Sequence, residues 1–462
     1  MKPSAIGYRL SAVLMLLWAP LAAQTSLSIY RDGRVVVRRT LPQALQQGRN
    51  VLTLKLEGLD PATLFSPDTA VSVNSAVVRY PSTPTDVLAR AVGQTLAFVR
   101  AKGDTISATV LRASPPQFKL SDGRLLLGMP GEPLFPAELV RTTPEAQVTL
   151  EAARARPRTD IAYVADGITW EALYQVIVTG ARVQVSGTAT ITSQGLRADS
   201  AEVQLVAGSI QRARAPGLLE AEAQSGVVTY NVRGAKASDF AASEEAVGET
   251  HVYQLPGRLS IEPNVPVTTA LFPRSGAPVT QELVVPGVVP WRGSIGQNPE
   301  PNRIPVQVWY TIKHAAKTPF GDRPLPAGTV QLYQADSSGR VQLIGEASTD
   351  HTAPGRDLRV QSGDAFDITA ERVQTDYNQE QLPPPRRGLP VRQRVTAAYR
   401  VTIANAKSQA VTVDVRESHF GDWKIVESSV AAEKLSSTES RFRVQVPAQG
   451  EATLTYTVQI EQ

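Results

Sequence analysis

The residues that could carry acid–base chemistry are few and widely spaced. Histidine occurs at only four positions, His251, His314, His351 and His419. No two of these form the HxH or HExxH spacing of a local zinc site. Asp350 directly precedes His351, and an aspartate beside an imidazole can fix its tautomer and bring its pKa near neutrality. The Ala-Pro-Gly segment at 353–355 turns the chain immediately after these residues. We therefore favour a turn over a catalytic site for the two catalytic candidates, Asp350 and His351.

Carboxylates are numerous, and a glycosidase needs only two of them about 5 to 9.5 Å apart. Glu171 is the candidate acid, because Trp170 and Tyr174 nearby could stack on a sugar ring. Apolar residues fall on alternate positions here, however, which places Glu171 on the face opposite both aromatic rings. We therefore expect Glu171 to be exposed and the two rings to belong to the core.

Four side chains are candidates for binding rather than catalysis: Trp291, Arg386, Arg387 and Trp423. Trp291 lies in a stretch, 284–305, that is too rich in proline and glycine for regular structure. Arg386 and Arg387 follow three prolines in a basic loop that could contact anionic polymers or act as a semi-rigid connector. Trp423 follows a Gly-Asp turn, so a core position is favoured over an exposed one.

Several chemistries have no support in the residue pattern. Ser209 follows a glycine, but the second glycine of the G-x-S-x-G elbow is missing, and no S-x-x-K or P-loop motif occurs. The chain has no cysteine, which excludes a thiol nucleophile, a cysteine zinc site and disulfides. We expect neither a metal nor a cofactor.

The elements that must position these residues are strands. Between 163 and 208, apolar residues occupy every second position in three successive runs, which start near Ile168, Val183 and Val203. This period is typical of strands with one buried face, and short polar turns between them predict one antiparallel sheet. Five similar runs follow at 395–404, 409–417, 423–429, 440–446 and 452–460. The sequence therefore predicts an all-β, multi-domain protein built of antiparallel β-sandwiches.

The domain organisation follows from turns and connectors along the 462 residues. We expect an N-terminal β region at 24–85 and a small SH3-like barrel at 86–140. A central β-sandwich with long loops is predicted at 141–324. The C-terminal β region, 325–462, begins with a hairpin that turns at 336–339 and ends in an immunoglobulin-like sandwich.

Residues 1–23 have the pattern of a signal peptide: Lys2 and Arg9, then an apolar run too short for a membrane span, then Ala22 and Ala23. Their removal lowers the formal net charge from +4 to +2, which gives no electrostatic case for nucleic acid. No later run is apolar for the length of a membrane span. We expect an exported protein, periplasmic or extracellular, without a membrane span after signal cleavage.

The succession of motifs resembles a known bacterial family. The motifs include DGITWEALYQV, VQLVAGSIQR, HVYQLPGRLSI, PFGDRPLPAGTVQLY and VRESHFGDWKIVESS. In this order they resemble an exported all-β domain-of-unknown-function family related to the C-terminal region of mucoidy-inhibitor-like proteins. The resemblance implies a β-sandwich in the cell envelope and no established activity. The long coiled coil of those relatives has no counterpart here, because no heptad run occurs.

Two functions follow as hypotheses. The first is a non-enzymatic binding or scaffold module of the cell envelope, whose partner, an envelope protein or polymer, is unknown. Recognition would use sheet edges and the loops at 211–250 and 284–303. The alternative is a carboxylate-dependent hydrolase acting on envelope glycans or peptides. An enclosed pocket with facing carboxylates of raised pKa would favour the hydrolase, and an open surface or groove would favour the binder.

Overall fold

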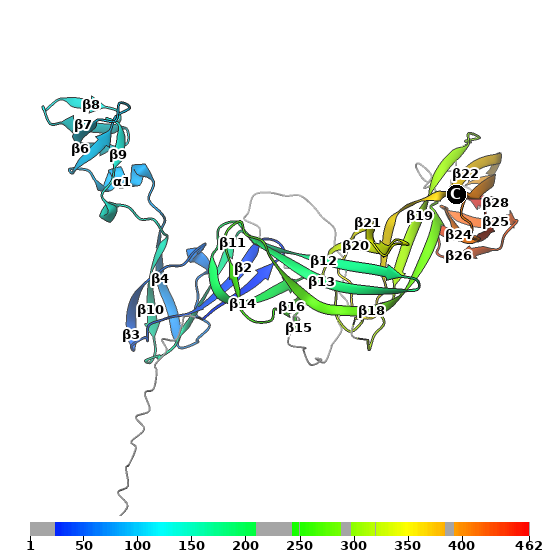
Figure 1. The fold of residues 1–462 in the computed structure, drawn as a ribbon, viewed down its shortest axis with the longest axis horizontal. Helices are drawn as coiled ribbons and strands as arrows, with labels where there is room; N and C mark the ends of the chain where they lie inside the picture. The colour runs from blue at the N-terminus through cyan, green and yellow to red at the C-terminus, as the bar shows by residue number, and fades with distance from the viewer. Residues whose placement is uncertain are drawn as a thin grey trace, which may run out of the picture. The chain divides into compact units, whose positions relative to one another are not determined.

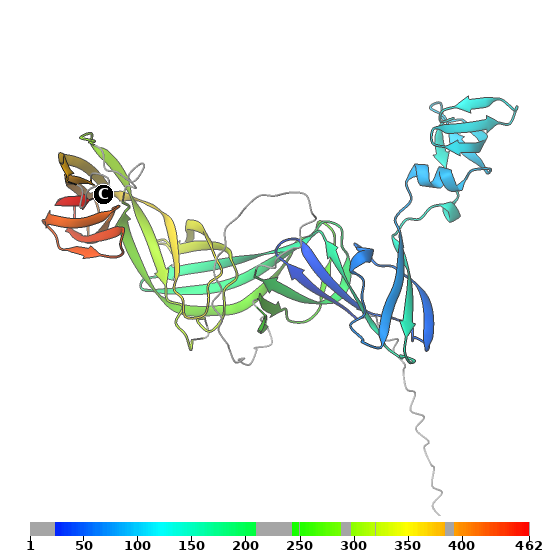
Figure 2. The same ribbon diagram turned by 180° about the vertical axis from the view of Figure 1, so that it is seen from behind.

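The structure is a computed structural model that describes residues 24–208, 243–248, 250–287, 297–318, 320–383 and 392–461. Strands form nearly all of the regular structure, so the predicted all-β, multi-domain fold is confirmed (Figure 1; Figure 2). Contacts between Cα atoms divide the chain into two compact units. The first unit contains Met1–Thr169, Thr192–Gln204 and Gly257–Pro266, and the second contains Trp170–Ile191, Leu205–Pro256 and Val267–Gln462.

A small five-stranded antiparallel sheet lies in the first unit, where the small barrel is predicted. Its strand order is β8-β7-β6-β5-β9, and β8 and β9 each pair with one neighbour, so these strands form an open sheet. Phe98 and Phe118 meet edge to face in its core, with ring centroids 5.1 Å apart. The strands are β5 (Thr95–Val99), β6 (Thr105–Ala113), β7 (Pro116–Leu120), β8 (Leu125–Leu127) and β9 (Glu132–Leu134).

One short helix, α1 (Pro84–Arg90), precedes this sheet, and the sequence analysis did not predict it. Thr83 begins it with a capping box: Asp86 N donates to Thr83 Oγ1 at 3.2 Å, and Thr83 N donates to Asp86 Oδ2 at 2.9 Å. Proline at the first helical position fits the same geometry. Leu88 of α1 packs into the core of the small sheet. Within the part of the chain that the structure describes, the other helical segments are two 3-10 turns, η1 (Pro61–Thr63) and η2 (Ala137–Leu139).

The rest of the first unit consists of two further sheets. One has the order β3-β10-β4, and the other begins β11-β2-β1-β14, with β17 paired to β14. Their strands are β1 (Thr25–Tyr30), β2 (Arg34–Thr40), β3 (Gly48–Leu54), β4 (Val71–Arg79), β10 (Glu145–Ala152), β11 (Asp160–Asp166), β14 (Ala198–Ala207) and β17 (Leu259–Ile261).

The three runs between 163 and 208 are all strands, but they do not form one sheet. β12 (Ile168–Thr179) and β13 (Arg182–Ser193) are neighbours, whereas β14 pairs with β1 and with β16 (Thr250–Gln254). β16 pairs in turn with β15 (Ser243–Val247). The expectation of one continuous three-stranded sheet is therefore wrong. Alternation specifies a buried face, but it does not specify which strand supplies the hydrogen bonds.

The second unit contains the largest sheet, whose path runs β21-β20-β12-β13-β18-β19-β22-β23-β28-β25. β20 and β21 form the predicted hairpin, and Gly339 N donates to the carbonyl of Asp336 at 2.9 Å in its turn. The pairs β12–β20 and β18–β24 are parallel. Six strands of this sheet are β18 (Val267–Val285), β19 (Asn302–Ile312), β20 (Gly328–Ala335), β21 (Val341–Thr349), β22 (Leu358–Leu382) and β23 (Arg392–Asn405), and the bounds of β24 to β28 are given with the C-terminal sandwich below.

Aromatic side chains fill the core beside β12 and β13. Phe272 lies between Tyr174 and Phe320, with ring centroids 6.1 and 6.0 Å away. Gly187 of β13 is required here, because an added Cβ would lie 2.4 Å from a ring carbon of Phe272. Tyr174 also donates its hydroxyl to the carbonyl of Pro326 at 2.6 Å.

All five of the predicted C-terminal runs are strands, and they pack around one buried core to form a sandwich. β24 (Val411–Ser418), β25 (Asp422–Ser428), β26 (Ala432–Lys434), β27 (Glu439–Val446) and β28 (Gly450–Glu461) supply most of it. β24 pairs with β18 and β27, and β26 pairs with β27, while β28 pairs with β23 and β25. The buried core between these strands also takes in Val285, Ile304 and Val306, which precede residue 325.

Candidate functional site

The acid–base candidates Asp350 and His351 lie in an exposed turn that follows β21. Ala327 N donates to His351 Nδ1 at 3.2 Å. The hydroxyls of Thr349 and Thr352 donate to the carbonyl of Asp350 at 3.2 and 3.1 Å. A neutral ring that accepts at Nδ1 carries its proton on Nε2. These contacts hold a turn together, and a catalytic role for the two residues stays a prediction.

Glu171 is exposed on β12, whereas Trp170 and Tyr174 are buried. This arrangement confirms the alternation that the sequence predicts. The carboxylate and the two rings lie on opposite faces of the strand. Glu171 therefore does not share a surface with a ring that could stack on a sugar.

Trp423 of β25 belongs to the sandwich core and is 7% exposed. Its indole Nε1 donates to the carbonyl of Ser437 at 2.6 Å. The ring is a packed part of the fold rather than an exposed docking side chain. The other binding candidates, Trp291, Arg386 and Arg387, lie outside the described residues, as does much of the loop predicted at 211–250.

A cavity of about 690 Å³ lies on the C-terminal sandwich, lined by residues of β19, β22, β23 and β28. We call it the outer groove. Two rows of residues in register supply its polar wall, and between them runs a third row whose Ile304, Ala370 and Ile403 are buried in the core. Because faces alternate along a strand, the polar rows lie on the outer face of the sheet. The rows are Arg303–Glu371–Thr402 and Pro305–Thr369–Ala404–Glu451.

An irregularity of β22 shapes one side of the outer groove. The pairing of β19 with β22 passes from Gln307↔Asp364 to Pro305↔Thr369, so residues 365–368 bulge opposite the single residue Val306. Ala365 lines the groove. Phe366 follows it in the chain and is 96% exposed. Phe366 therefore presents apolar surface one residue along the chain from the lining of the groove.

The outer groove is mildly acidic and adjoins a second cavity. One arginine and two glutamates line it, Arg303, Glu371 and Glu451, so its formal charge is −1. A second cavity of about 350 Å³ shares Ala404 and Glu451 with the groove. The surface thus combines hydroxyl, carboxylate and guanidinium groups with apolar side chains, which is the mixture that small-molecule sites use.

A second polar cluster is buried inside the sandwich. Arg372 of β22 donates to a carboxylate oxygen of Glu417 on β24 and, at 2.5 Å, to the Tyr456 hydroxyl on β28. The guanidinium also lies over the ring of Tyr399, 4.5 Å from its centroid. Burial raises the pKa of Glu417, although Arg372 acts in the opposite direction. This carboxyl does not line the outer groove.

His419 follows Glu417 closely in the chain and is also buried. Its Nε2 lies 2.8 Å from the Ser440 hydroxyl, and its ring packs against Trp423 with centroids 4.3 Å apart. Burial lowers the pKa of His419 to about 4, and the charges of Arg372 and Lys434 act in the same direction. The imidazole is therefore neutral at neutral pH and acts as a hydrogen-bonding core residue.

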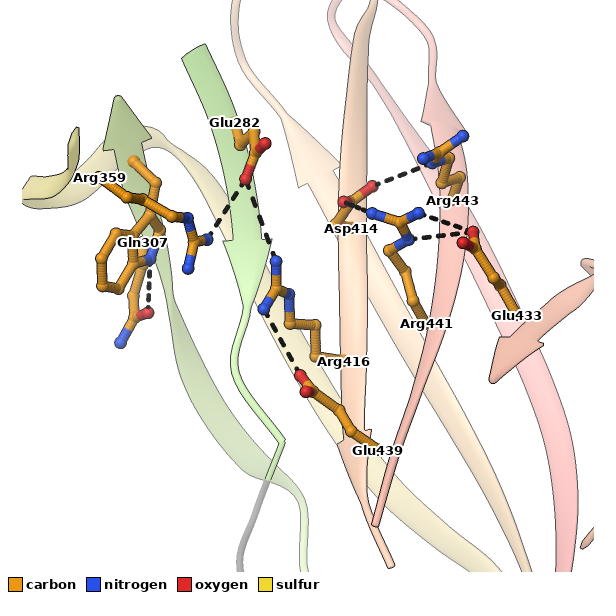
Figure 3. A network of polar contacts seen from close by, with 10 residues as sticks. Glu282, Gln307, Arg359, Asp414, Arg416, Glu433, Glu439, Arg441 and Arg443 are labelled. Carbon is orange, nitrogen blue, oxygen red and sulfur yellow. Dashed lines mark hydrogen bonds and ion pairs between the residues drawn. The ribbon is translucent and has the colours of Figure 1, made fainter. Parts of the chain in front are cut away.

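A chain of ion pairs links β22, β18, β24 and β27 in the sandwich (Figure 3). Glu282 lies between Arg359, at 3.2 Å, and Arg416, at 4.0 Å. Arg416 continues the chain to Glu439 at 3.5 Å. Arg359 also stacks on the Trp309 ring, 4.1 Å from its centroid.

A second, separate cluster of ion pairs lies on β24, β26 and β27 (Figure 3). Arg441 pairs with Glu433 at 2.7 Å and with Asp414 at 3.4 Å, and Arg443 reaches Asp414 at 3.9 Å. The chain and the cluster together contain four arginines and four carboxylates, so their formal charges cancel. Such a surface holds neighbouring strands together and offers no net attraction to a charged partner.

Sequence reasoning missed both the outer groove and the buried Arg372–Glu417 pair. The segment Gly-Asp-Ala-Phe-Asp at 363–367 contains a signal, because Phe366 stands between polar residues where strand alternation breaks. No comparable signal marks the buried pair, since its two members are 45 positions apart in the chain.

Three further findings concern the chain as a whole. Among the described residues, no group of three or more histidine, aspartate or glutamate side chains is placed to hold a metal ion. Over the same residues, no helix has the length and apolarity that crossing a membrane requires. No protein-family model, curated protein or solved structure matches the chain.

Proposed function

We propose that the chain is an exported cell-envelope protein that acts as a non-enzymatic binding or scaffold module. The observation that carries this proposal is the outer groove, a cavity of about 690 Å³ on a packed β-sandwich whose lining includes Ala365, the residue before the exposed Phe366. A rigid protein loses little conformational entropy when it binds a partner, so less of the favourable binding free energy is offset. The basic and apolar pattern of residues 1–23 supports export, and the partner would be an envelope protein or polymer.

The distribution of perturbed carboxyls supports binding over catalysis. Glu417 is a carboxyl whose pKa burial raises, and it is held by Arg372 in the core, away from the groove. A general acid must reach its substrate, because proton transfer requires hydrogen-bond distance. Glu417 therefore fits a structural role.

The binding proposal is tested by filling the groove. Ala404→Trp places an indole among the lining residues, and Thr455→Trp is the matched control, four positions after Glu451 on β28. Immobilised mature protein is exposed to a solubilised envelope fraction, and captured components are quantified by mass spectrometry. We expect components retained by the wild type and by Thr455→Trp to be lost from Ala404→Trp. Equal capture by all three proteins would overturn the proposal.

One observation keeps the hydrolase as a second candidate: Glu371 and Glu451 line the same groove. They stand on β22 and β28 with β23 between them, and their register partners on β23 are Thr402 and Ala404. Strand spacing of about 4.8 Å and a rise of about 3.4 Å per residue place their Cα atoms about 12 Å apart. Long side chains can bring such carboxylates within the range of an inverting glycosidase, about 6.5 to 9.5 Å.

The hydrolase is tested on isolated peptidoglycan by following newly released reducing ends and amino groups. Under the binding proposal, the wild type releases no more product than the Glu371→Gln and Glu451→Gln variants. Release by the wild type that either substitution abolishes would favour the hydrolase instead.

A further inference from the structure

We propose that the ligand of the outer groove is an uncharged oligosaccharide, an inference that rests on the proposed binding function. The first argument comes from the backbone. Thr369 of β22 is paired on both sides, with Pro305 and Ala404, and Ala404 is paired with Thr369 and Glu451. A ligand above these two strands therefore meets no free row of backbone groups, which excludes strand addition at the centre of the groove. Recognition there depends on side chains.

The side chains of the groove match the groups of a sugar. Sugar hydroxyls both donate and accept hydrogen bonds, so carboxylates can accept from them and a guanidinium can donate to them. Glu371 and Glu451 supply the acceptors, Arg303 supplies the donor, and the hydroxyls of Thr369 and Thr402 do either. No group in this set needs a charged partner on the ligand.

The charge of the groove limits the ligand further. Two glutamates against one arginine leave a formal charge of −1, which repels polyanions such as uronic acid polymers. An uncharged ligand avoids this repulsion.

Phe366 supplies the apolar part of the recognition. Its ring is 96% exposed and follows Ala365, which lines the groove. The C–H face of a sugar ring is apolar, and covering an aromatic face with it removes apolar surface from water. The cavity of about 690 Å³ falls within the range of about 300 to 1,000 Å³ for ligand sites, which suits a few sugar units.

The test is isothermal titration of the mature protein with four defined probes: chitohexaose, maltohexaose, hexalysine and polygalacturonate. We expect saturable binding of at least one of the two uncharged sugars and none of the charged probes. Phe366→Ala should weaken sugar binding about tenfold or more, which corresponds to the loss of about 1.4 kcal/mol. Val426→Ala, which shortens an exposed apolar side chain on β25, is the matched control and should bind as the wild type does. Far-ultraviolet circular dichroism confirms that each variant is folded.

The contrary outcomes are distinct. Binding of hexalysine or polygalacturonate without the sugars, binding of none of the probes, or sugar binding unchanged in Phe366→Ala would each overturn the sugar inference. If groove-dependent capture of envelope components persists while the sugars fail to bind, only the ligand class is wrong. If Ala404→Trp changes neither capture nor sugar binding, the proposed function fails with it.

Discussion

Arg372 and Glu417 form an ion pair inside the C-terminal sandwich, where water cannot solvate either charge. The side chains are 11% and 2% exposed. Removing one partner leaves the other buried and unpaired, which costs more than removing both. The hydrogen bond from Arg372 to the Tyr456 hydroxyl adds a link to β28, so the pair joins β22, β24 and β28. Its role at this scale is to specify how these strands pack.

The first prediction concerns this pair. Arg372→Met should lower the free energy of unfolding by about 3 to 5 kcal/mol, because the Glu417 carboxylate loses its buried partner. The double variant Arg372→Met, Glu417→Leu should recover much of that loss, because it removes both charges. Urea denaturation measures both values. A double variant that is no more stable than the single variant would contradict the prediction.

The second prediction concerns pH. The ordinary pKa of histidine is 6.5, and burial lowers the pKa of His419 to about 4. The unfolded chain therefore binds this proton more tightly than the folded chain does. The resulting stability is fully present above pH 6.5 and is lost as the pH falls from 6.5 to about 4, by about 3 kcal/mol in total.

His419→Gln keeps a polar side chain but removes this titration. Its free energy of unfolding should fall less steeply than that of the wild type between pH 6.5 and 4, as denaturant titrations at stepped pH can measure. Parallel curves for the two proteins over that interval would show that His419 is not the group responsible.

At the level of elements, two kinds of contact hold the strands of the sandwich together. The alternating apolar faces meet in the core. Two separate sets of ion pairs add to this: one joins β18, β24 and β27, and the other joins β24, β26 and β27 (Figure 3). The irregularity of β22 opposite Val306 interrupts the regular ladder. The outer groove lies at this interruption, and the bulge of β22 shapes one side of it. The packed sandwich holds the groove rigid.

The third prediction compares how much two arginines of the second ion-pair cluster contribute to stability. Arg441 is 16% exposed and contacts two carboxylates, so Arg441→Ala should destabilise the protein by about 1 kcal/mol. Arg443 is 61% exposed and lies 3.9 Å from Asp414, so Arg443→Ala should cost less than about 0.5 kcal/mol. Denaturation in dilute buffer and in about 1 M salt checks both values, since salt should shrink the difference. Equal losses that do not depend on salt would contradict an electrostatic origin.

At the scale of the whole molecule, the chain is divided into two compact units built mostly of strands. It contains no cysteine, so no disulfide supplements its cores. Domains of this size can be stable on apolar burial alone, because the buried fraction of the surface rises with chain length. We propose that export of the chain depends on the N-terminal segment, residues 1–23.

The fourth prediction concerns that segment. We propose cleavage after Ala23, so the exported protein should begin at Gln24. Expression of the full chain in a bacterial host, followed by intact-mass measurement of the periplasmic fraction and the medium, checks this. Replacement of Leu16 and Leu17 by Arg is the control and should hold the uncleaved chain inside the cell. Recovery of the full-length mass from the exported fraction would contradict signal cleavage.

The pattern of side chains was sufficient to predict the three runs between 163 and 208 and the five C-terminal runs as strands. Alternation from Ile168 to Thr179 specifies a strand with Trp170 and Tyr174 inside and Glu171 outside, and the structure confirms this. The period of two is local, so it needs no information about partners. The helix α1 carried a local signal as well, the Thr-Pro-Thr-Asp capping sequence, although the sequence analysis did not use it.

Only the tertiary structure decided which strands are neighbours and what they place together. β14 pairs with β1 rather than extending the sheet of β12 and β13, and Arg372 meets Glu417 across 45 positions. The outer groove also depends on the pairing of four strands that are far apart in the chain. The physical reason is that a buried face specifies that a strand must pack, but the packing and hydrogen bonding of the complete fold select its partner.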